Sequence, residues 1–391
     1  MRILILHNRY VDPGGEDVVV AWQTELLRAA GHTVEVHEAR NADGPGGIQP
    51  FLLAPWNPFA ARDVERVARA FDPDVAYVHN TWFSLSPSVV RVLQRLGIPT
   101  LLALHNYRLV CGNAQFYRDG GPCTLCVDDG PLPGVVNRCY QGFGGSLVAA
   151  ATIQAWRVSG LIDTIDAYVL FNDWARDMMV RGGLPADRVH VIPHATEDPG
   201  PRPAPPSQAE DYLWVGRLVE EKGIVDLVEA WDVIGQGRRL VVVGDGPLRG
   251  DVEHLATGRN VVIRGRLEKS QVYELMMNSR CLVMSSRGPE AFGLVLIEAM
   301  AASLPVIVSR TLPISPTVER NSSGWVADDI ASWRRAVAES LDDDELDRRS
   351  ANARRQYISD HTPKRLVEEL VSLLRSVAKP GLGAELCGDL G

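Results

Sequence analysis

Two basic residues, Arg217 and Lys222, follow a short apolar strand in the second half of the chain. Arg217 comes directly after the run YLWVG (212–216), and Lys222 is expected to open the next helix. Two fixed cations beside a helix N-terminus suit a diphosphate and the negative charge that develops on it as it leaves. The alternative is a pair of solvated surface charges, with Glu220 and Glu221 as their partners.

Glu290 and Glu298 form a second pair around a loop that contains glycine and proline. In a continuous helix their spacing would separate them by about 12 Å, whereas glycosidase carboxylates lie roughly 5–9.5 Å apart. The spacing therefore favours two separate tasks, one carboxylate in the loop and one on the helix behind it. Each could accept hydrogen bonds from hydroxyls of a sugar or a ribose. Backbone N–H groups that could face phosphate oxygens belong to Phe292, Gly293, Leu294 and Val295.

Glycines follow two of the apolar strands. Gly244 and Gly246 come after the run LVVV, with a spacing that differs from the G-x-G-x-x-G fingerprint, so a hydride-transfer enzyme is the least supported class. They either let a nucleotide approach the backbone or form a plain tight turn. Gly14 and Gly15 join the first strand to the first helix and leave that helix N-terminus free for a phosphate.

His105 ends a predicted strand in the first half, where a histidine can donate to a sugar hydroxyl or take a proton. The alternative is a histidine that caps the backbone. His79 and Asn80 repeat the arrangement one strand earlier. Aromatic residues that could shape an acceptor site, or belong to the core, are Trp56, Phe59, Trp82 and Phe83.

Four cysteines, Cys111, Cys123, Cys126 and Cys139, lie in one loop-rich segment with the spacing C-x11-C-x2-C-x12-C. In a reducing cytoplasm a structural zinc held by four thiolates explains them better than disulfides do. The outer spacings are not those of a standard zinc ribbon, so a loop without metal is equally compatible.

Composition excludes several partners. The 391 residues carry 49 acids and 40 bases, a net charge of −9 that disfavours nucleic acid and anionic membrane surfaces. The sequence contains no run of 18 or more apolar residues, so no transmembrane segment is predicted. The opening MRILILH is read as a strand rather than a secretion signal, so a cytoplasmic location is expected. The preference for arginine over lysine suggests a bacterial source.

Short apolar strands alternate with amphipathic helices, which predicts an α/β protein with parallel sheets. Its length favours two domains, and the proline-rich segment 198–210 is predicted to be a linker. Ligands of such sheets bind at the carboxyl ends of the strands, here in a cleft between the domains. Strands are predicted at 2–7, 33–38, 74–79, 99–104, 166–171, 188–192, 211–216, 239–244, 260–264, 280–284 and 304–308, and helices near 16–30, 86–96, 146–162, 173–181 and 366–377.

In their order and spacing, these motifs resemble the retaining GT-B glycosyltransferases of family 4, also called group 1. The most specific parts are PEAFGLVLIEAMAASLPVIVS and WVGRLVEEKG, and VVVGDGPL and HNRYVDPGGED agree with them. The resemblance covers essentially the whole chain.

The resemblance implies two Rossmann-like domains that face each other across a cleft. Residues 1–197 would bind the acceptor, and residues 211–361 would bind the nucleotide-sugar. A C-terminal helix at about 362–378 would pack back on the first domain.

The resemblance also implies roles for single residues. Arg217 and Lys222 would hold the diphosphate, Glu290 the hydroxyls of the transferred sugar, and Glu298 the ribose. His105 would contact the sugar and Gly15 the phosphate. Other residues expected around the donor are Gly216, Gly244, Gly246, Arg266, Leu267, Phe292, Gly293, Leu294 and Val295.

The expected reaction is front-face transfer of a sugar, with retention, from a nucleoside diphosphate sugar to a hydroxyl of a small molecule or glycan. A UDP-sugar is the expected donor. No metal is required for catalysis in such enzymes, and the cysteine loop is not a general feature of the family. The alternatives are an epimerase or phosphorylase on the same fold, or a non-catalytic nucleotide-sugar-binding subunit.

Overall fold

The computed structural model describes residues 1–10, 14–41 and 45–379, and it divides into two compact units. The first unit comprises Met1–Ala114, Thr124–Ile192 and the C-terminal segment from Leu366. The second comprises Gln115–Cys123 and Pro193–Arg365. Within the described residues, no helix is both long and apolar enough to cross a membrane.

A six-stranded parallel sheet forms the centre of the first unit, in the order β2-β1-β3-β4-β7-β8. The central strands are fully buried, because parallel sheets are covered on both faces. All six strands were predicted, and each predicted end lies within two residues of the observed end. They are β1 (Arg2–Arg9), β2 (Thr33–Arg40), β3 (Val75–Val78), β4 (Thr100–Ala103), β7 (Ala167–Leu170) and β8 (Val189–Val191).

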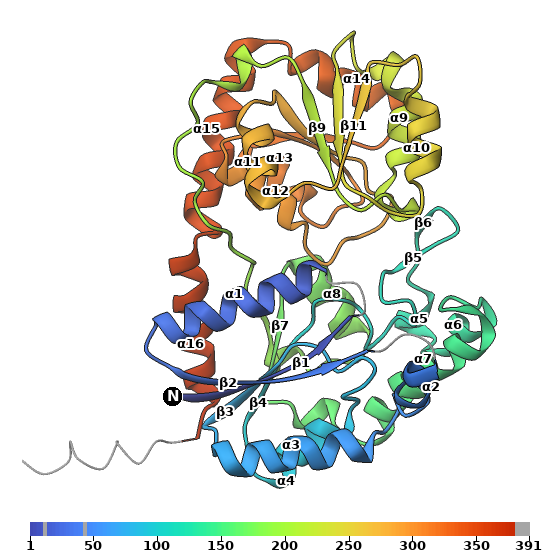
Figure 1. The fold of residues 1–391 in the computed structure, drawn as a ribbon, viewed down its shortest axis with the longest axis vertical. Coiled ribbons are helices and arrows are strands. Elements are labelled where there is room, and N and C mark those ends of the chain that lie inside the picture. Colours follow the sequence, from blue (N-terminus) through green and yellow to red (C-terminus); the bar gives the residue numbers. More distant parts are fainter. Residues whose placement is uncertain (11–13, 42–44, 380–391) are drawn as a thin grey trace, which may run out of the picture. The chain divides into compact units, whose positions relative to one another are not determined.

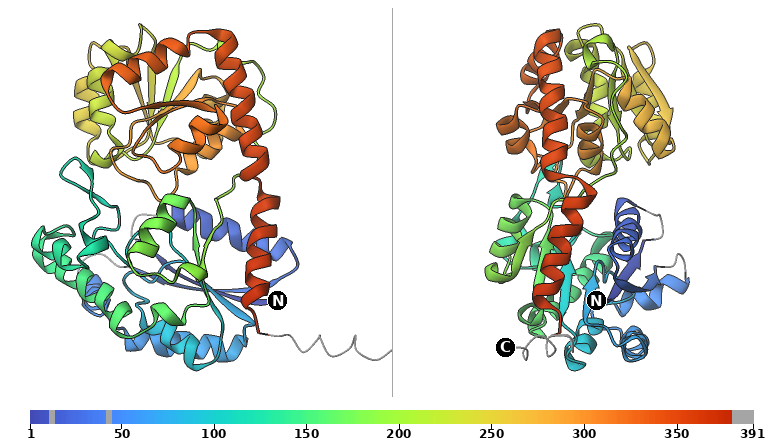
Figure 2. Two further views of the ribbon diagram at one scale, coloured as in Figure 1. Left: turned by 180° about the vertical axis from the view of Figure 1, so that it is seen from behind. Right: turned by 90° about the vertical axis from the view of Figure 1, so that its left-hand side faces the viewer.

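Helices cover both faces of this sheet, with α1 on one side and α3 and α4 on the other (Figure 1). The view from behind in Figure 2 shows the same arrangement. The helices of this unit are α1 (Gly15–Ala29), α2 (Pro45–Leu52), α3 (Pro58–Phe71), α4 (Ser88–Arg95), α5 (Leu125–Asp128), α6 (Leu132–Val136), α7 (Gly142–Val158), α8 (Asp173–Arg181) and α16 (Pro363–Val377).

The second unit contains another six-stranded parallel sheet, in the order β11-β10-β9-β12-β13-β14. Read along the chain, this is the Rossmann order 3-2-1-4-5-6. Strand β14, which follows β13 through a short helix, was not predicted. The strands are β9 (Tyr212–Val215), β10 (Leu240–Val243), β11 (Val261–Gly265), β12 (Cys281–Met284), β13 (Val306–Ser309) and β14 (Gly324–Ala327).

Two apolar cores flank this sheet, because successive strand residues point to opposite faces. On β9, Tyr212 and Trp214 join the core that includes Trp231, while Leu213 joins the core that includes Met300 and Tyr357. Figure 1 shows α9 and α10 on one side and α11, α12 and α15 on the other. The helices are α9 (Ile224–Ile234), α10 (Arg249–Ala256), α11 (Lys269–Met277), α12 (Leu294–Ala301), α13 (Ser315–Asn321), α14 (Ile330–Glu339) and α15 (Asp343–Asp360).

The first unit is not the continuous segment 1–197 that was predicted. A two-stranded hairpin, β5 (Tyr117–Arg118) and β6 (Gly121–Pro122), is grouped with the second unit. The reason is visible in its contacts, since the Tyr117 hydroxyl donates to Glu220 at 3.0 Å and the Gln115 side chain donates to Glu221 at 3.1 Å.

The proline-rich segment 198–210, which was predicted to be a linker, connects β8 to β9 and is held by hydrogen bonds. It contains a 3-10 turn (Pro206–Gln208) and belongs to the second unit. Its carbonyl groups find buried donors, because Arg280 Nη1 donates to the carbonyls of Ser207 at 3.0 Å and Ala209 at 3.2 Å. A proline-rich segment has few backbone N–H donors, because proline lacks one, but every residue keeps its carbonyl acceptor.

The C-terminal helix belongs to the first unit from Leu366 onward, in line with the arrangement that the resemblance implied. Its residues Glu368, Ser372 and Leu373 line one groove together with β8. The backbone N–H of Lys379 donates to the carbonyl of Asp74 at 3.1 Å, which ties the end of the helix to the loop before β3.

Replacing Arg280 by methionine should destabilise the second unit. Arg280 is 2% exposed and also bonds the carbonyl of Ser340 at 2.9 Å and Asp343 at 2.7 Å. R280M keeps much of the volume but leaves buried carbonyls without donors, so we expect a loss of about 2–4 kcal/mol in the free energy of unfolding. Urea denaturation measures it.

The matched control is R310M, because Arg310 is 53% exposed and pairs with Glu319 and Asp328 at the surface. An exposed ion pair contributes about 1 kcal/mol or less. Equal losses in the two variants would show that the buried contacts of Arg280 do not stabilise the fold in this way.

Candidate active site

The order of strands in the second unit reverses between β9 and β12. Chains that leave these two neighbouring strands diverge, and ligands of open α/β sheets bind at such a switch point. Arg217 and Lys222 follow β9, and Glu290 follows β12, so the strongest predicted residues come from the two loops that flank this point.

Lys222 and Glu290 form an ion pair there, with 2.6 Å between Lys222 Nζ and Glu290 Oε2. The two side chains are 24% and 16% exposed. Ser286 Oγ donates to the other carboxylate oxygen of Glu290, and Ser285 Oγ donates to the carbonyl of Lys222 at 2.9 Å. These contacts fasten the two loops to each other and hold both charges in defined positions.

The structure excludes the alternative partners that the sequence offered for these cations. Glu220 accepts from Tyr117 and Glu221 from Gln115, and neither pairs with Arg217 or Lys222. The Arg217 side chain is exposed and has no ion pair with any described residue. One position differs from the expectation, because Lys222 ends a 3-10 turn (Glu220–Lys222) and α9 begins two residues later.

Two glycines allow the loops of this site to approach each other closely. A Cβ on Gly244, which has φ +142°, would lie 1.8 Å from the carbonyl oxygen of Gly216. A Cβ on Gly223, which has φ +64°, would lie 2.1 Å from the carbonyl oxygen of Ser285. The protein's own backbone therefore requires glycine at both positions, and Gly246 meets the carbonyl of Leu218 in the same way.

Glu290 and Glu298 occupy the two kinds of position that their spacing suggested. Glu290 lies in the loop before α12, while Glu298 is on the helix itself. Burial raises the pKa of Glu298 above its ordinary value, and Lys269 opposes this shift. Gly293 is the N-cap residue of α12, so the N–H groups of the following residues are at the start of a helix.

The predicted base-side residues are at the end of β11. Arg266 is exposed and Leu267 is half-buried, and Leu267 packs against the core that contains Met276 and Met300. Gly244 donates its backbone N–H to the carbonyl of Gly265 at 2.9 Å, which places these residues beside the loop after β10.

Two histidines near Phe292 escaped sequence reasoning. The ring centroid of His194 lies 4.9 Å from that of Phe292, and the ring centroid of His361 lies 6.0 Å away. Burial lowers the pKa of His194 to about 3, so this imidazole is neutral at physiological pH. No sequence motif links the two histidines. The short stretch VIPHAT (191–196), which contains His194, is the one sequence feature that could have drawn attention to it.

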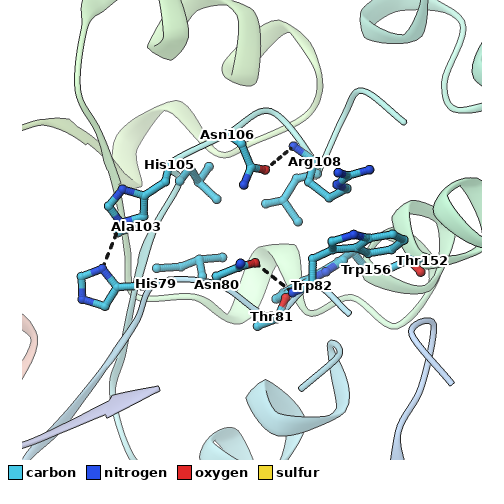
Figure 3. A pocket seen from close by; sticks show the side chains of 13 residues that line it. His79, Asn80, Thr81, Trp82, Ala103, His105, Asn106, Arg108, Thr152 and Trp156 are labelled. Atoms are coloured by element: carbon cyan, nitrogen blue, oxygen red, sulfur yellow. Dashed lines mark hydrogen bonds between the residues drawn. The ribbon is translucent and has the colours of Figure 1, made fainter. Parts of the chain in front are cut away.

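His105 lies beside His79 in the first unit (Figure 3). His79 Nδ1 and His105 Nε2 are 2.9 Å apart, and their rings stack with centroids 5.2 Å apart. His105 Nε2 is therefore hydrogen-bonded to a side chain rather than to the backbone. Either His79 Nδ1 or His105 Nε2 carries the proton of this bond. The two histidines that follow β3 and β4 are therefore direct neighbours.

Gly15 is the first residue of α1, and both Gly14 and Gly15 are exposed. Asp12 and Pro13 of this predicted loop lie outside the described residues. Asp17 Oδ2 accepts from the backbone N–H of Gly14 at 2.8 Å, and His7 Nε2 lies 2.9 Å from Asp17 Oδ1.

Glu16, next in the helix, is buried beneath these groups. Its Oε1 has no hydrogen-bond partner, and burial raises its pKa to about 8. The first turn therefore carries less negative charge at neutral pH than its composition suggests.

The predicted zinc site is not reproduced. Within the described residues, no group of three or more His, Cys, Asp or Glu side chains could hold a metal ion. Cys123 follows the hairpin and belongs to the second unit, whereas Cys111, Cys126 and Cys139 belong to the first. Cys111 Sγ lies 2.9 Å from Asn113 Oδ1, and burial raises the pKa of the Cys126 thiol to about 11.

The predicted site residues thus fall into two groups. His105 and Gly15 belong to the first unit, and the expected donor residues belong to the second, where they follow β9, β10, β11 and β12. Of the four candidate acceptor aromatics, Trp82 is 3% exposed and core-like, while Trp56 and Phe59 are 42% and 55% exposed.

Two family models match the chain. Residues 201–357 match the model for glycosyl transferases group 1, and residues 14–195 match that for a glycosyl transferase 4-like domain. Together these matches leave few described residues outside them.

Known proteins give the same picture. The chain is 25% identical over 422 aligned positions to glycogen synthase of Mycobacterium tuberculosis, with 97% of this chain and 96% of that protein covered. It is 28% identical over 221 residues to the alpha-D-kanosaminyltransferase of Streptomyces kanamyceticus, which covers 51% of this chain and 57% of that protein. The crystal structure of Anabaena HepE in complex with UDP matches with a TM-score of 0.67 and 16% identity, over 96% of this chain and 100% of that chain. This likeness shows the predicted GT-B fold.

Replacing Glu16 by glutamine should stabilise the protein at high pH. In the unfolded chain this acid ionises near its ordinary value of 4.5, while the folded protein holds the proton until about pH 8. Stability is therefore lost as the pH rises between these values. From pH 5 to pH 8 we expect the gain of E16Q over the wild type to grow on the order of 3 kcal/mol.

Urea denaturation at pH 5 and pH 8 measures this difference. E25Q is the control, because Glu25 lies on the same helix with a 74% exposed side chain. A gain of E16Q that does not change with pH would contradict the assignment of a buried, protonated Glu16.

Proposed function

We propose that this chain, which belongs to the group 1 glycosyltransferases, transfers a sugar from a nucleoside diphosphate sugar to a hydroxyl with retention at the anomeric carbon. The observation that carries the proposal is the Lys222–Glu290 pair at the switch point of the second sheet, with Arg217 exposed and unpaired among the described residues beside it. Two cations and a sugar-binding carboxylate are what a glycosyl diphosphate requires.

The two cations have different starting states. Arg217 can donate hydrogen bonds to a diphosphate oxygen without first giving up an ion-pair partner. Lys222 is already paired with Glu290, so a donor that takes Lys222 for its phosphate frees that carboxylate for the hydroxyls of the sugar. Phosphate binding and sugar binding are thereby coupled.

The reaction we favour is a front-face substitution. The acceptor oxygen forms a bond to the anomeric carbon on the side from which the diphosphate leaves, and the acceptor proton passes to an oxygen of the leaving group. Arg217 and Lys222 stabilise the charge that grows on that group. They supply positive charge that a metal ion could otherwise supply, so the proposal uses no metal.

The remaining expected contacts divide between the nucleoside and the sugar. Glu298, whose pKa burial raises, would accept from the ribose hydroxyls, and the residues at the end of β11 would lie beside the base. His105, oriented by His79, would contact the transferred sugar.

A UDP-sugar is our proposed donor. HepE, a structural relative, was solved with UDP and with UDP-glucose. A different relative, 28% identical over 177 residues, is named a GDP-mannose-dependent mannosyltransferase of Mycobacterium tuberculosis. A thermal-shift screen against UDP, GDP, ADP and dTDP distinguishes the bases, and the largest shift is expected with UDP.

Arg217→Ala should reduce turnover on the order of 100-fold, by comparison with the removal of one preorganised donor that stabilises a developing charge. Initial rates of sugar transfer with the donor found in the screen measure the effect. R334A is the matched control, since Arg334 is an exposed arginine on α14 of the same unit and should leave the rate unchanged.

Near-normal turnover of R217A would sink the assignment. A reaction without acceptor separates this proposal from an epimerase, because an epimerase would still convert the donor. Donor binding without any turnover would instead favour a non-catalytic nucleotide-sugar-binding subunit.

A further inference from the structure

A small cavity in the first unit lies at the carboxyl ends of β3 and β4 and is closed by α7 (Figure 3). Its volume is about 40 Å³, room for one small polar group with water. Among the thirteen described residues that line it, Arg108 carries the one formal charge, and none is Asp or Glu. A positively charged site of this kind favours a negatively charged group.

The guanidinium of Arg108 is fixed between two aromatic rings. Its central carbon lies 4.5 Å from the centroid of the Trp82 ring and 4.6 Å from that of Tyr140. Nη1 donates to the carbonyl of Gly112, and Asn106 Oδ1 accepts the backbone N–H of Arg108 at 3.0 Å. The charge is therefore held in one place, with its plane set before any ligand arrives.

Arg108 nevertheless lacks the partners that buried cations usually have. Its Nε is buried without an acceptor, and no described carboxylate lies within ion-pair distance. An unmade hydrogen bond of this kind costs free energy. The rings attract the cation and Nη1 has the carbonyl of Gly112, but the Nε–H donor is left without an oxygen acceptor.

Other buried arginines of the same chain show what a structural role looks like. Arg202 donates from Nε to the carbonyl of Ala204 and from its two terminal nitrogens to those of Met276 and Ser279. Arg280 bonds three carbonyls and Asp343. Arg108 differs, because its Nε has no acceptor and the residue lines a cavity.

We propose that Arg108 binds an oxyanion, a carboxylate or a phosphate, carried by the acceptor. This inference rests on the proposed function, in which Arg217 and Lys222 of the second unit take the donor diphosphate and the first unit takes the acceptor. Planar guanidinium and oxyanion groups match in a two-point contact. Trp82, Tyr140 and Asn106 act as positioning residues that keep the guanidinium in place.

The test compares the full-length wild type with R108Q and R108K. Sodium acetate, inorganic phosphate and sodium chloride are titrated at matched ionic strength, so that general screening is the same in all three. In the wild type, acetate or phosphate should shift the Arg108 Nε–Hε signal in a 15N-labelled sample, the signal being assigned by its loss in R108Q. Calorimetry should show roughly 10- to 100-fold weaker anion binding by R108Q, with partial retention in R108K.

Two controls make the outcome specific. R66Q, at a side chain 75% exposed on α3, should bind anions like the wild type, and circular dichroism and thermal unfolding verify that R108Q is folded. A response to acetate points to a carboxylate on the acceptor, and a response to phosphate without acetate points to a phosphorylated acceptor. Equal anion binding by wild type and R108Q, or no shift of the Arg108 signal, would overturn the inference.

Failure here is distinguishable from failure of the proposed function. UDP binding by R108Q should equal that of the wild type, because Arg108 is not among the residues expected to contact the donor. If Arg108 binds anions but the wild type binds none of the four nucleoside diphosphates, the proposed donor site fails and the anion site remains.

Discussion

The ion pair between Lys222 and Glu290 holds both charges in place at the switch point of the second sheet. The pair joins the loops after β9 and β12, which belong to strands adjacent in the sheet but far apart in the chain. Both side chains are largely shielded, so either charge without the other would be unfavourable. In the proposed function, a donor would replace both halves of the pair, with its phosphate at Lys222 and its sugar hydroxyls at Glu290.

The arginines of this chain differ in the partners they find. Arg202 and Arg280 of the second unit donate to carbonyl oxygens and stabilise loops, and Arg188 of the first unit also donates to carbonyls. Arg217 is left exposed, without an ion pair among the described residues. In the first unit, aromatic rings hold Arg108 where no described carboxylate meets it. The arginines that complete the fold thus differ in their partners from the two arginines for which we propose ligands.

The sheets could be predicted because buried parallel strands are continuous apolar runs, such as LVVV at 240–243 and CLVM at 281–284. Helix α3 was missed although Asn57 caps it and Pro58 occupies its first turn, two signals of a helix start. Strand β14 was missed because four residues, GWVA, carry little pattern.

Site residues were predictable as far as they follow neighbouring strand ends. That reasoning located Arg217, Lys222 and Glu290 but could not give the direct contact between Lys222 and Glu290, which depends on how two distant loops pack. His194 and His361 escaped for the same reason. The cysteine spacing alone did not determine whether the thiols come together, and the described residues form no group of three or more side chains that could hold a metal ion.

Helix α16 gives the first unit a dependence on the order of synthesis. Its buried residues Leu366, Leu370 and Leu374 belong to that unit, yet the ribosome makes them after residues 193–365. A nascent chain that has completed β8 still lacks this apolar face, so its surface beside β8 stays uncovered while the whole second sheet is translated. Chaperone binding during translation is therefore expected to concentrate on that exposed strip of the emerging polypeptide.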